Sequence, residues 1–160
     1  EGTTAFEVSQ RVIELVQNSR AAAIQVLINS PGGSVYDGLS MLDAFDMARQ
    51  NEVKVITRVQ GQAQSMAADL LILGGDYRSI SKNSFIMTHG DIDHELRFGD
   101  MLDIETEIRI RGITGNRLLD MYEQKTKRPR AFWKKMFKDS RCVYWTPEEA
   151  LDAGLVDVIF

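Results

Sequence analysis

The alternation of short, β-branched segments with longer amphipathic ones constrains the fold of this chain more than any other feature of its sequence. Residues 5–18 carry apolar side chains at helical spacing, whereas residues 24–29 form a short β-branched run that ends at a turn signal. A second helical pattern covers residues 36–50, and residues 53–59 give the next strand pattern. Strands and helices that alternate in this way predict an α/β fold with crossover connections.

The second half of the chain continues this alternation. Thr146, followed by Pro147 and two glutamates, predicts a helix start, because threonine caps a helix, proline suits its first position and acids complement its dipole. The other elements expected here are a helix from Ser65 to about Gly74, a strand at residues 84–88, a long helix at residues 100–125, a helix at residues 130–138 and a last strand at residues 155–160.

Size and composition indicate a single globular domain spanning residues 1–160. The net charge is −4, and the most basic stretch, residues 125–138, is interleaved with aromatic side chains, which is typical of a packed helix rather than a nucleic-acid surface. The single cysteine, Cys142, excludes an internal disulfide and favours a reducing, cytoplasmic compartment. No apolar run approaches the length of a membrane span, so we expect no membrane contact.

Ser65 lies where a strand gives way to an apolar helix, in a turn of small residues. A serine hydroxyl becomes a nucleophile only when a base removes its proton, and the start of a helix offers free N–H groups to a developing oxyanion. The position follows the logic of a nucleophile elbow, although the G-x-S-x-G pattern is absent. Taken alone, this turn favours the simpler alternative that Ser65 only caps the helix.

The chain has two histidines that could serve as a base, His89 and His94. His89 directly follows an apolar strand, so a rigid element can aim it, and we expect it to be the general base. His94 lies among Asp91, Asp93 and Glu95, but this spacing matches no metal-binding motif, and we expect no metal.

Pro31, Gly32 and Gly33 come just past the carboxyl end of a predicted strand. Glycines at such a place allow backbone N–H groups to face a ligand, as an oxyanion hole requires. A plain turn explains the same residues equally well. The segment therefore predicts a site only in combination with Ser65 and His89.

Together and in this order, the three features resemble signature stretches of the ClpP family, whose ClpP/crotonase-like fold consists of stacked β-β-α units with a projecting handle helix. The resemblance covers essentially the whole chain, and the segment around Ser65 is its most specific part. The stretches that carry it are Ile28-Asn29-Ser30-Pro31-Gly32-Gly33, Gly61-Gln62-Ala63-Gln64-Ser65-Met66-Ala67-Ala68, Met87-Thr88-His89, Glu149-Ala150 and Gly154-Leu155-Val156-Asp157.

The resemblance implies a serine endopeptidase that cleaves unfolded polypeptides inside an oligomeric barrel. Ser65 would be the nucleophile, His89 the general base, and the N–H groups of Gly33 and Met66 the oxyanion hole. Residues 100–125 would be the handle helix that joins two stacked heptameric rings of identical subunits. The protein itself would need no cofactor, because ATP would be used only by a partner, a cytoplasmic AAA+ unfoldase.

The resemblance also implies an aspartate at the end of the helix at residues 130–138, which would fix the tautomer of His89 and stabilise its cation. Counting back from the closing motif without gaps gives Lys138, whereas Asp139 requires a small deletion and an insertion in the flanking loops, which loops tolerate. We expect Asp139 to be the third member of the triad. The alternative is a slow Ser–His dyad or an inactive subunit.

The segment after His89 departs from the family. Residues 90–99 are rich in acids where the family has a glycine-rich strand that pairs with substrate, so we expect neutral or basic substrate side chains to be favoured there.

Three other functions stay open from the sequence. One is a crotonase-type acyl-CoA enzyme, which relies on glutamate or aspartate and needs no serine at position 65. Another is a Ser–Lys protease with Lys54 or Lys82 as its base, although His89 fits better. The third is a catalytically silent ClpP-like ring or scaffold subunit.

Overall fold

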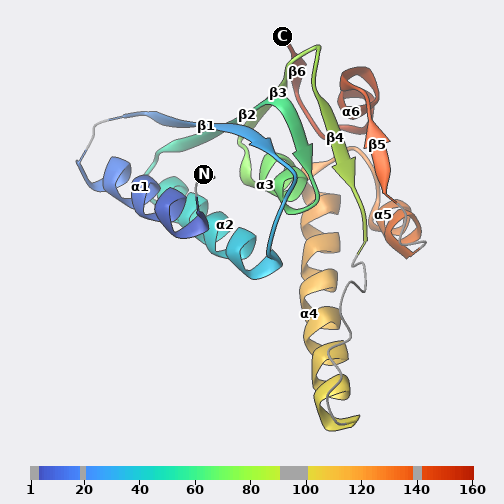
Figure 1. The fold of residues 1–160 in the computed structure, drawn as a ribbon. Coiled ribbons are helices and arrows are strands. Elements are labelled where there is room, and N and C mark those ends of the chain that lie inside the picture. The colour runs from blue at the N-terminus through green and yellow to red at the C-terminus, as the bar shows by residue number, and fades with distance from the viewer. Residues whose placement is uncertain (1–3, 19–20, 91–100, 139–141) are drawn as a thin grey trace.

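The computed structural model describes residues 4–18, 21–90, 101–138 and 142–160, which form a mixed sheet flanked by helices (Figure 1). The strands are β1 (Ala23–Ser30), β2 (Lys54–Gln64), β3 (Tyr77–Ile80), β4 (Phe85–Thr88), β5 (Val143–Trp145) and β6 (Val158–Ile159). Strand β2 pairs in parallel with β1, β3 and β4, whereas β5 is antiparallel to β4 and β6 is parallel to β3. The parallel pairs around β2 agree with the crossover connections that the sequence predicts.

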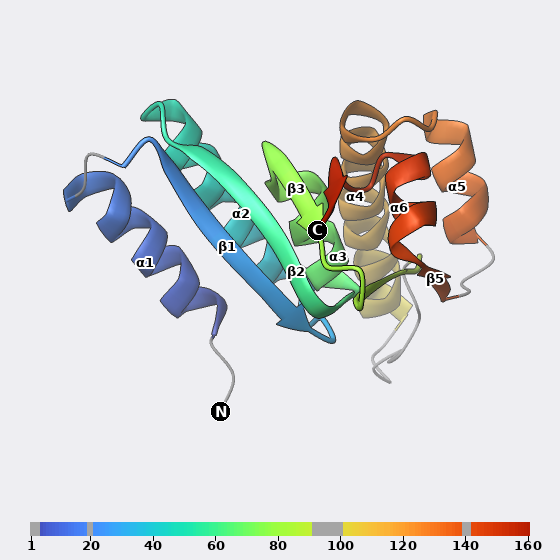
Figure 2. The same ribbon diagram turned by 90° about the horizontal axis from the view of Figure 1, so that it is seen from above.

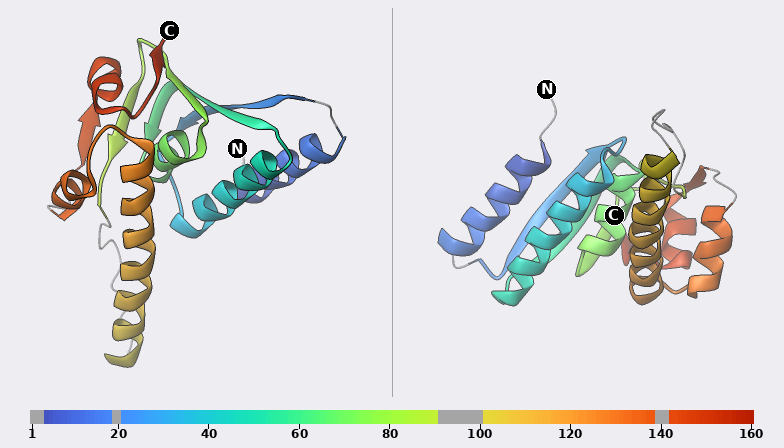
Figure 3. Two further views of the ribbon diagram at one scale, coloured as in Figure 1. Left: turned by 180° about the vertical axis from the view of Figure 1, so that it is seen from behind. Right: turned by 90° about the horizontal axis from the view of Figure 1, so that it is seen from below.

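The helices are α1 (Ala5–Asn18), α2 (Val35–Gln50), α3 (Met66–Gly74), α4 (Met101–Lys125), α5 (Arg130–Lys138) and α6 (Pro147–Ala153). Helices α1 and α2 lie side by side below β1 and β2, and α3 packs next to α2 (Figures 1 and 2). Helices α5 and α6 lie at the other end of the sheet from α1 (Figure 2). Helix α4 projects from the body, as the views from the front and from behind show (Figures 1 and 3). The predicted α/β fold class, with its projecting helix, is therefore confirmed.

Helix α3 is almost wholly buried, and its packing holds the residue that precedes it in place. Seven of its nine residues are buried, and each large apolar side chain among them stabilises the fold by about 1.5–3 kcal/mol. Close packing of the helix depends on glycine: a Cβ on Gly38 would collide with the Met66 side chain, and one on Gly74 would lie 2.8 Å from the Phe45 ring. Helix α3 cannot shift without opening the core, so its first turn is a rigid platform.

The structure contains two strands that the sequence patterns did not predict, β3 and β5. The sequence pattern does not predict β3 because a charged residue, Arg78, interrupts its apolar residues. In the structure this arginine is nevertheless only 8% exposed. Strand β5 is three residues long and pairs only with β4. Strands this short give little periodicity to recognise.

Two predicted boundaries also change. Strand β2 continues to Gln64 instead of ending at Val59, because its last residues pair with β4. The last strand is shorter than predicted, since Leu155 and Val156 are buried in the core and only Val158–Ile159 pair with β3.

Arg78 joins parts of the chain that are far apart in the sequence. Its guanidinium donates to the two carboxylate oxygens of Asp157 at 2.7 and 3.1 Å, and to the carbonyl oxygens of Lys125 and Gly154 at 2.8 and 2.9 Å. Burial opposes the ionisation of Asp157, but the hydrogen bonds from Arg78 outweigh it and lower the pKa of this carboxyl. Arg78 thus ties the end of α4 and the segment after α6 to the sheet.

Replacing Arg78 with methionine leaves a carboxylate without its partner. We expect the free energy of unfolding at pH 7 to fall by about 3 kcal/mol, at the low end for buried pairs because 35% of the Asp157 side chain is exposed. A lowered aspartate pKa stabilises the fold above the unfolded value of about 4. The difference between the two proteins should therefore shrink as the pH falls through the lower folded pKa.

Chemical denaturation at several pH values measures this difference. The matched control is Arg128→Met, which breaks the exposed pair with Asp152 and should cost less than about 1 kcal/mol. Equal losses for the two variants would show that Arg78 is not a structural tie.

Candidate active site

The turn that joins β2 to α3 consists of Ser65 alone. Its backbone has φ 53° and ψ −131°, a conformation that residues with a side chain rarely adopt. The Ser65 N–H donates to the carbonyl oxygen of Met87 at 2.8 Å, and the Ser65 carbonyl oxygen accepts from the N–H groups of Ala68 and Asp69. The hydroxyl makes no hydrogen bond to the start of the helix. Ser65 therefore does not cap α3 with its side chain, which is available for another partner.

Strand β4 brings His89 to this turn. The register of β2 and β4 pairs Gln64 with Met87, so the residues that follow the two strands lie beside each other. His89 Nε2 is 2.8 Å from Ser65 Oγ, and His89 Nδ1 contacts the carbonyl oxygen of Gly90. A carbonyl oxygen only accepts, so Nδ1 carries the proton and Nε2 accepts from the Ser65 hydroxyl. His89 thus meets Ser65 in the state that a general base requires.

The loop after β1 packs against the same turn. Gly32 has φ +103°, and a Cβ there would lie 2.7 Å from Ser65 Cβ and 3.2 Å from the Met66 nitrogen. A Cβ on Gly33, in contrast, would meet nothing within 4 Å. Met66 is the first residue of α3, so its N–H has no partner within the helix. The structure brings the glycine loop and the helix start together, and the oxyanion-hole role of Gly33 and Met66 stays a prediction.

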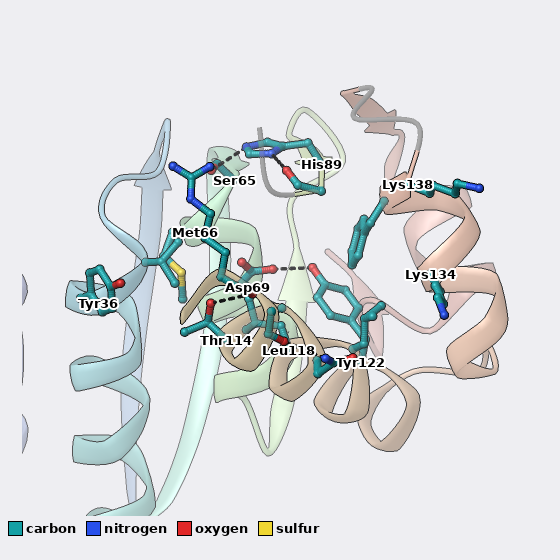
Figure 4. A pocket seen from close by; sticks show the side chains of 18 of the residues that line it. Tyr36, Ser65, Met66, Asp69, His89, Thr114, Leu118, Tyr122, Lys134 and Lys138 are labelled. Carbon is teal, nitrogen blue, oxygen red and sulfur yellow. Dashed lines mark hydrogen bonds between the residues drawn. The ribbon is translucent and has the colours of Figure 1, made fainter. Parts of the chain in front are cut away.

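A cavity of about 610 Å³ opens beside Ser65 and His89 (Figure 4). Residues from the start of α2, from α3, from α4 and from α5 line it. Its size lies within the range of pockets that bind small molecules or substrate side chains. The cavity therefore gives a substrate group a place next to the Ser65 hydroxyl.

Asp69 is the residue of this cavity that the sequence alone did not single out. It follows Ser65 by four positions, and its Oδ1 accepts a hydrogen bond from Tyr122 Oη at 2.6 Å (Figure 4). Burial raises the pKa of Asp69 to about 6, although the hydrogen bond from Tyr122 and the nearby His89 lower it. Burial and the Asp69 charge raise the pKa of Tyr122 well above its ordinary value. The sequence does contain one signal that indicates Asp69. It is the one acid in an otherwise apolar helix, and it lies one turn after the nucleophile.

Several expected residues lie outside the described part of the chain. These are Asp139, the third member of the predicted triad, and His94 with its neighbouring acids, so their roles stay predictions. Lys138, the position given by the ungapped count, is exposed at the cavity and extends away from Asp69 (Figure 4). An ammonium group has only donors, so Lys138 cannot accept the proton of His89 Nδ1.

The described residues also bear on metal binding and on membrane insertion. No group of three or more histidine, cysteine, aspartate or glutamate side chains in that part could hold a metal ion. None of its helices is long and apolar enough to cross a membrane.

Comparison with known proteins gives one consistent result. The chain matches the family described as Clp protease over residues 1–160. The ATP-dependent Clp protease proteolytic subunit of Deinococcus radiodurans is 31% identical over 162 residues, which cover 99% of this chain and 75% of that protein. The corresponding subunit of Bacteroides thetaiotaomicron is 33% identical, with 85% of this chain and 59% of that protein covered.

A third relative supports the same assignment. Proteolytic subunit 1 of the ATP-dependent Clp protease of Protochlamydia amoebophila is 29% identical, with 98% of this chain and 74% of that protein covered. This chain thus spans 59% to 75% of the length of these three relatives. The match over all residues and the relative from Deinococcus radiodurans agree with the motifs around Ser65 and His89. The chain belongs to the Clp protease family.

Proposed function

We propose that this protein is a serine endopeptidase with Ser65 as its nucleophile and His89 as its general base. The observation that carries the proposal is the 2.8 Å contact between Ser65 Oγ and His89 Nε2, made at a turn with an unfavourable backbone conformation. A serine that only begins a helix needs neither a histidine beside its hydroxyl nor an unfavourable backbone conformation. Both are requirements of a nucleophile that must be exposed and activated.

The reaction follows from this geometry. His89 Nε2 takes the hydroxyl proton as Ser65 Oγ bonds to the carbonyl carbon of the substrate, whose oxygen becomes an oxyanion. The N–H groups of Gly33 and Met66 would bind that oxyanion. His89 then gives its proton to the leaving amine, which leaves an acyl-enzyme. Water hydrolyses the acyl-enzyme in a second round, with His89 again as the base.

The Gly90 carbonyl oxygen supplies part of what a third triad member does. It holds the Nδ1 proton and so selects the tautomer of His89. A neutral carbonyl group offers only a partial charge to the imidazolium that forms in the transition state. Asp139 would supply the full charge, and its approach to His89 would turn a slow dyad into a complete triad.

The subunit would act within a homo-oligomer. Helix α4 exposes Ile108, Ile110 and Ile113 to 61%, 40% and 61%. Apolar side chains on a projecting helix favour burial against another subunit, which supports a homo-oligomer. Two stacked heptameric rings are the form that the resemblance to the family implies. The relatives are named as proteolytic subunits of an ATP-dependent protease. We therefore place the protein in the cytoplasm with an AAA+ unfoldase, which would use the ATP and deliver unfolded polypeptide, while this chain would need no cofactor.

A fluorophosphonate probe tests the nucleophile directly. We expect it to modify Ser65 of the wild-type protein, because the activated Oγ attacks phosphorus as it attacks a carbonyl carbon. Ser65→Ala should abolish the labelling, and His89→Ala should slow it by about 100-fold or more, which is the usual contribution of a general base. Mass spectrometry of the labelled peptide identifies the site, and the labelling rate gives the effect of His89.

The matched control is His94→Ala, which removes the other histidine of the chain and should leave the labelling rate unchanged. A folded oligomer that is never labelled at Ser65 would support the silent ring subunit instead. Bound CoA in native mass spectra would support the acyl-CoA enzyme.

A further inference from the structure

Among its described lining residues, the cavity beside Ser65 combines apolar walls with one carboxylate. Met66 from α3 and Leu118 from α4 contribute apolar surface, and Asp69 lies between Met66 and Tyr122 (Figure 4). Asp69 belongs to none of the ion pairs found among the described residues. The hydrogen bond from Tyr122 is made to one of its two oxygens, Oδ1. A carboxylate that forms no ion pair among the described residues is unusual in a partly apolar wall.

The hydrogen bond to Tyr122 does not by itself require an acid. An asparagine or glutamine carbonyl group also accepts from a tyrosine hydroxyl and carries no charge into the cavity. Burial raises the pKa of Asp69 to about 6, which is the sign that its charged form is disfavoured there. Even so, a group with this pKa is mostly ionised at pH 7.5. Asp69 therefore brings a negative charge to the cavity at a cost in stability.

The position of Asp69 relative to the nucleophile suits a substrate side chain. Asp69 follows Ser65 by four residues, which corresponds to about 6 Å along a helix. A side chain that enters the cavity from a carbonyl carbon bound at Ser65 Oγ would pass the apolar walls before it meets the carboxylate. Lysine and arginine side chains have this order of groups, an aliphatic stem followed by a cationic head.

Cationic side chains also line the cavity, and none of them forms an ion pair with Asp69 among the described residues. Lys134 and Lys138 of α5 are exposed, so water screens their charges. Arg111 of α4 also lines the cavity, and its side chain is not free of interactions. Attraction to a charge in a partly dry site is about four times stronger than in bulk water. The half-buried carboxylate should therefore attract a cationic side chain that reaches the inner part of the cavity.

We propose that Asp69 makes this cavity a subsite for a lysine or arginine side chain on the acyl side of the scissile bond. The substrate class is then a polypeptide cleaved after a basic residue. This selection adds to the proposed peptidase function and rests on it, since the side chain is placed by the carbonyl carbon that Ser65 attacks.

Matched fluorogenic peptides that differ only at this position test the proposal. We expect the wild-type protein at pH 7.5 to cleave the lysine peptide with a kcat/KM about ten- to a hundredfold above that of the norleucine peptide, which has the same stem without the charge. In Asp69→Asn the ratio should fall to within about threefold of one, because the amide still accepts from Tyr122 but no longer attracts the ammonium. Asp37→Asn, which removes an exposed acid outside the cavity, should keep the wild-type ratio.

Binding to Ser65→Ala separates this selection from the proposed function. Calorimetry should show tighter binding of the lysine peptide than of the norleucine peptide, with the difference lost in Ser65→Ala/Asp69→Asn. Preferential binding without cleavage by the wild-type protein would overturn the peptidase function alone. Cleavage of both peptides at equal rates, or equal binding of the two, would overturn the role of Asp69.

The charge on Asp69 can be measured through stability. A raised aspartate pKa means that the unfolded chain ionises first, so the fold loses stability as the pH rises from about 4 to about 6. Asp69→Asn removes this loss and should raise the Tm by about 3–6 °C at pH 8, with no difference near pH 4. Thermal unfolding at the two pH values shows the effect. A shift that is the same at both would mean that the fold does not raise the pKa of Asp69, so the carboxylate would not lie in the poorly solvated position that the proposed selection requires.

Discussion

The backbone conformation of Ser65 links the packing of this fold to the chemistry of its candidate active site. One residue alone connects the central strand β2 to the buried helix α3, and it does so with φ 53° and ψ −131°. Both neighbours are fixed, because β2 is paired on both sides and α3 is almost wholly buried. Ser65 cannot relax to an ordinary conformation without moving one of them, so the core maintains a strain of about 1–3 kcal/mol at the nucleophile.

The same sheet delivers the partners of Ser65. Strand β4 ends beside β2 and places His89 Nε2 at 2.8 Å from the hydroxyl, while the loop after β1 places Gly32 against Ser65 and Met66. These contacts come from strand register and not from long flexible side chains. The geometry is therefore set before a substrate arrives, which is what electrostatic stabilisation of an oxyanion requires. Like the strained turn at Ser65, Asp69 costs the fold stability, because its charge lies where burial raises its pKa.

The sequence predicted the parts of this site that depend on local patterns. Ser65 and His89 each follow a recognisable strand, and their short motifs carry the resemblance to the family. Asp69 and β3, which contains Arg78, were not predicted for one physical reason. The role of an isolated charged residue in an apolar segment depends on its partner, and the partner is not apparent from the local sequence. The partner of Asp69 is Tyr122, 53 positions away, and that of Arg78 is Asp157, 79 positions away. Such pairings are set by tertiary packing, which periodicity does not encode.

Ser65→Gly tests whether the fold holds Ser65 in a strained turn for the sake of its hydroxyl. Glycine adopts the observed φ and ψ freely, so the substitution relieves the strain of the folded state. This gain should exceed the free-energy cost of the greater entropy of the unfolded chain, and the free energy of unfolding should rise by about 1 kcal/mol. Ser34→Gly, at the unstrained N-cap of α2 with φ −61°, should instead lower it by a few tenths or more. A fall in stability for Ser65→Gly equal to that of Ser34→Gly, measured by chemical denaturation, would contradict the account.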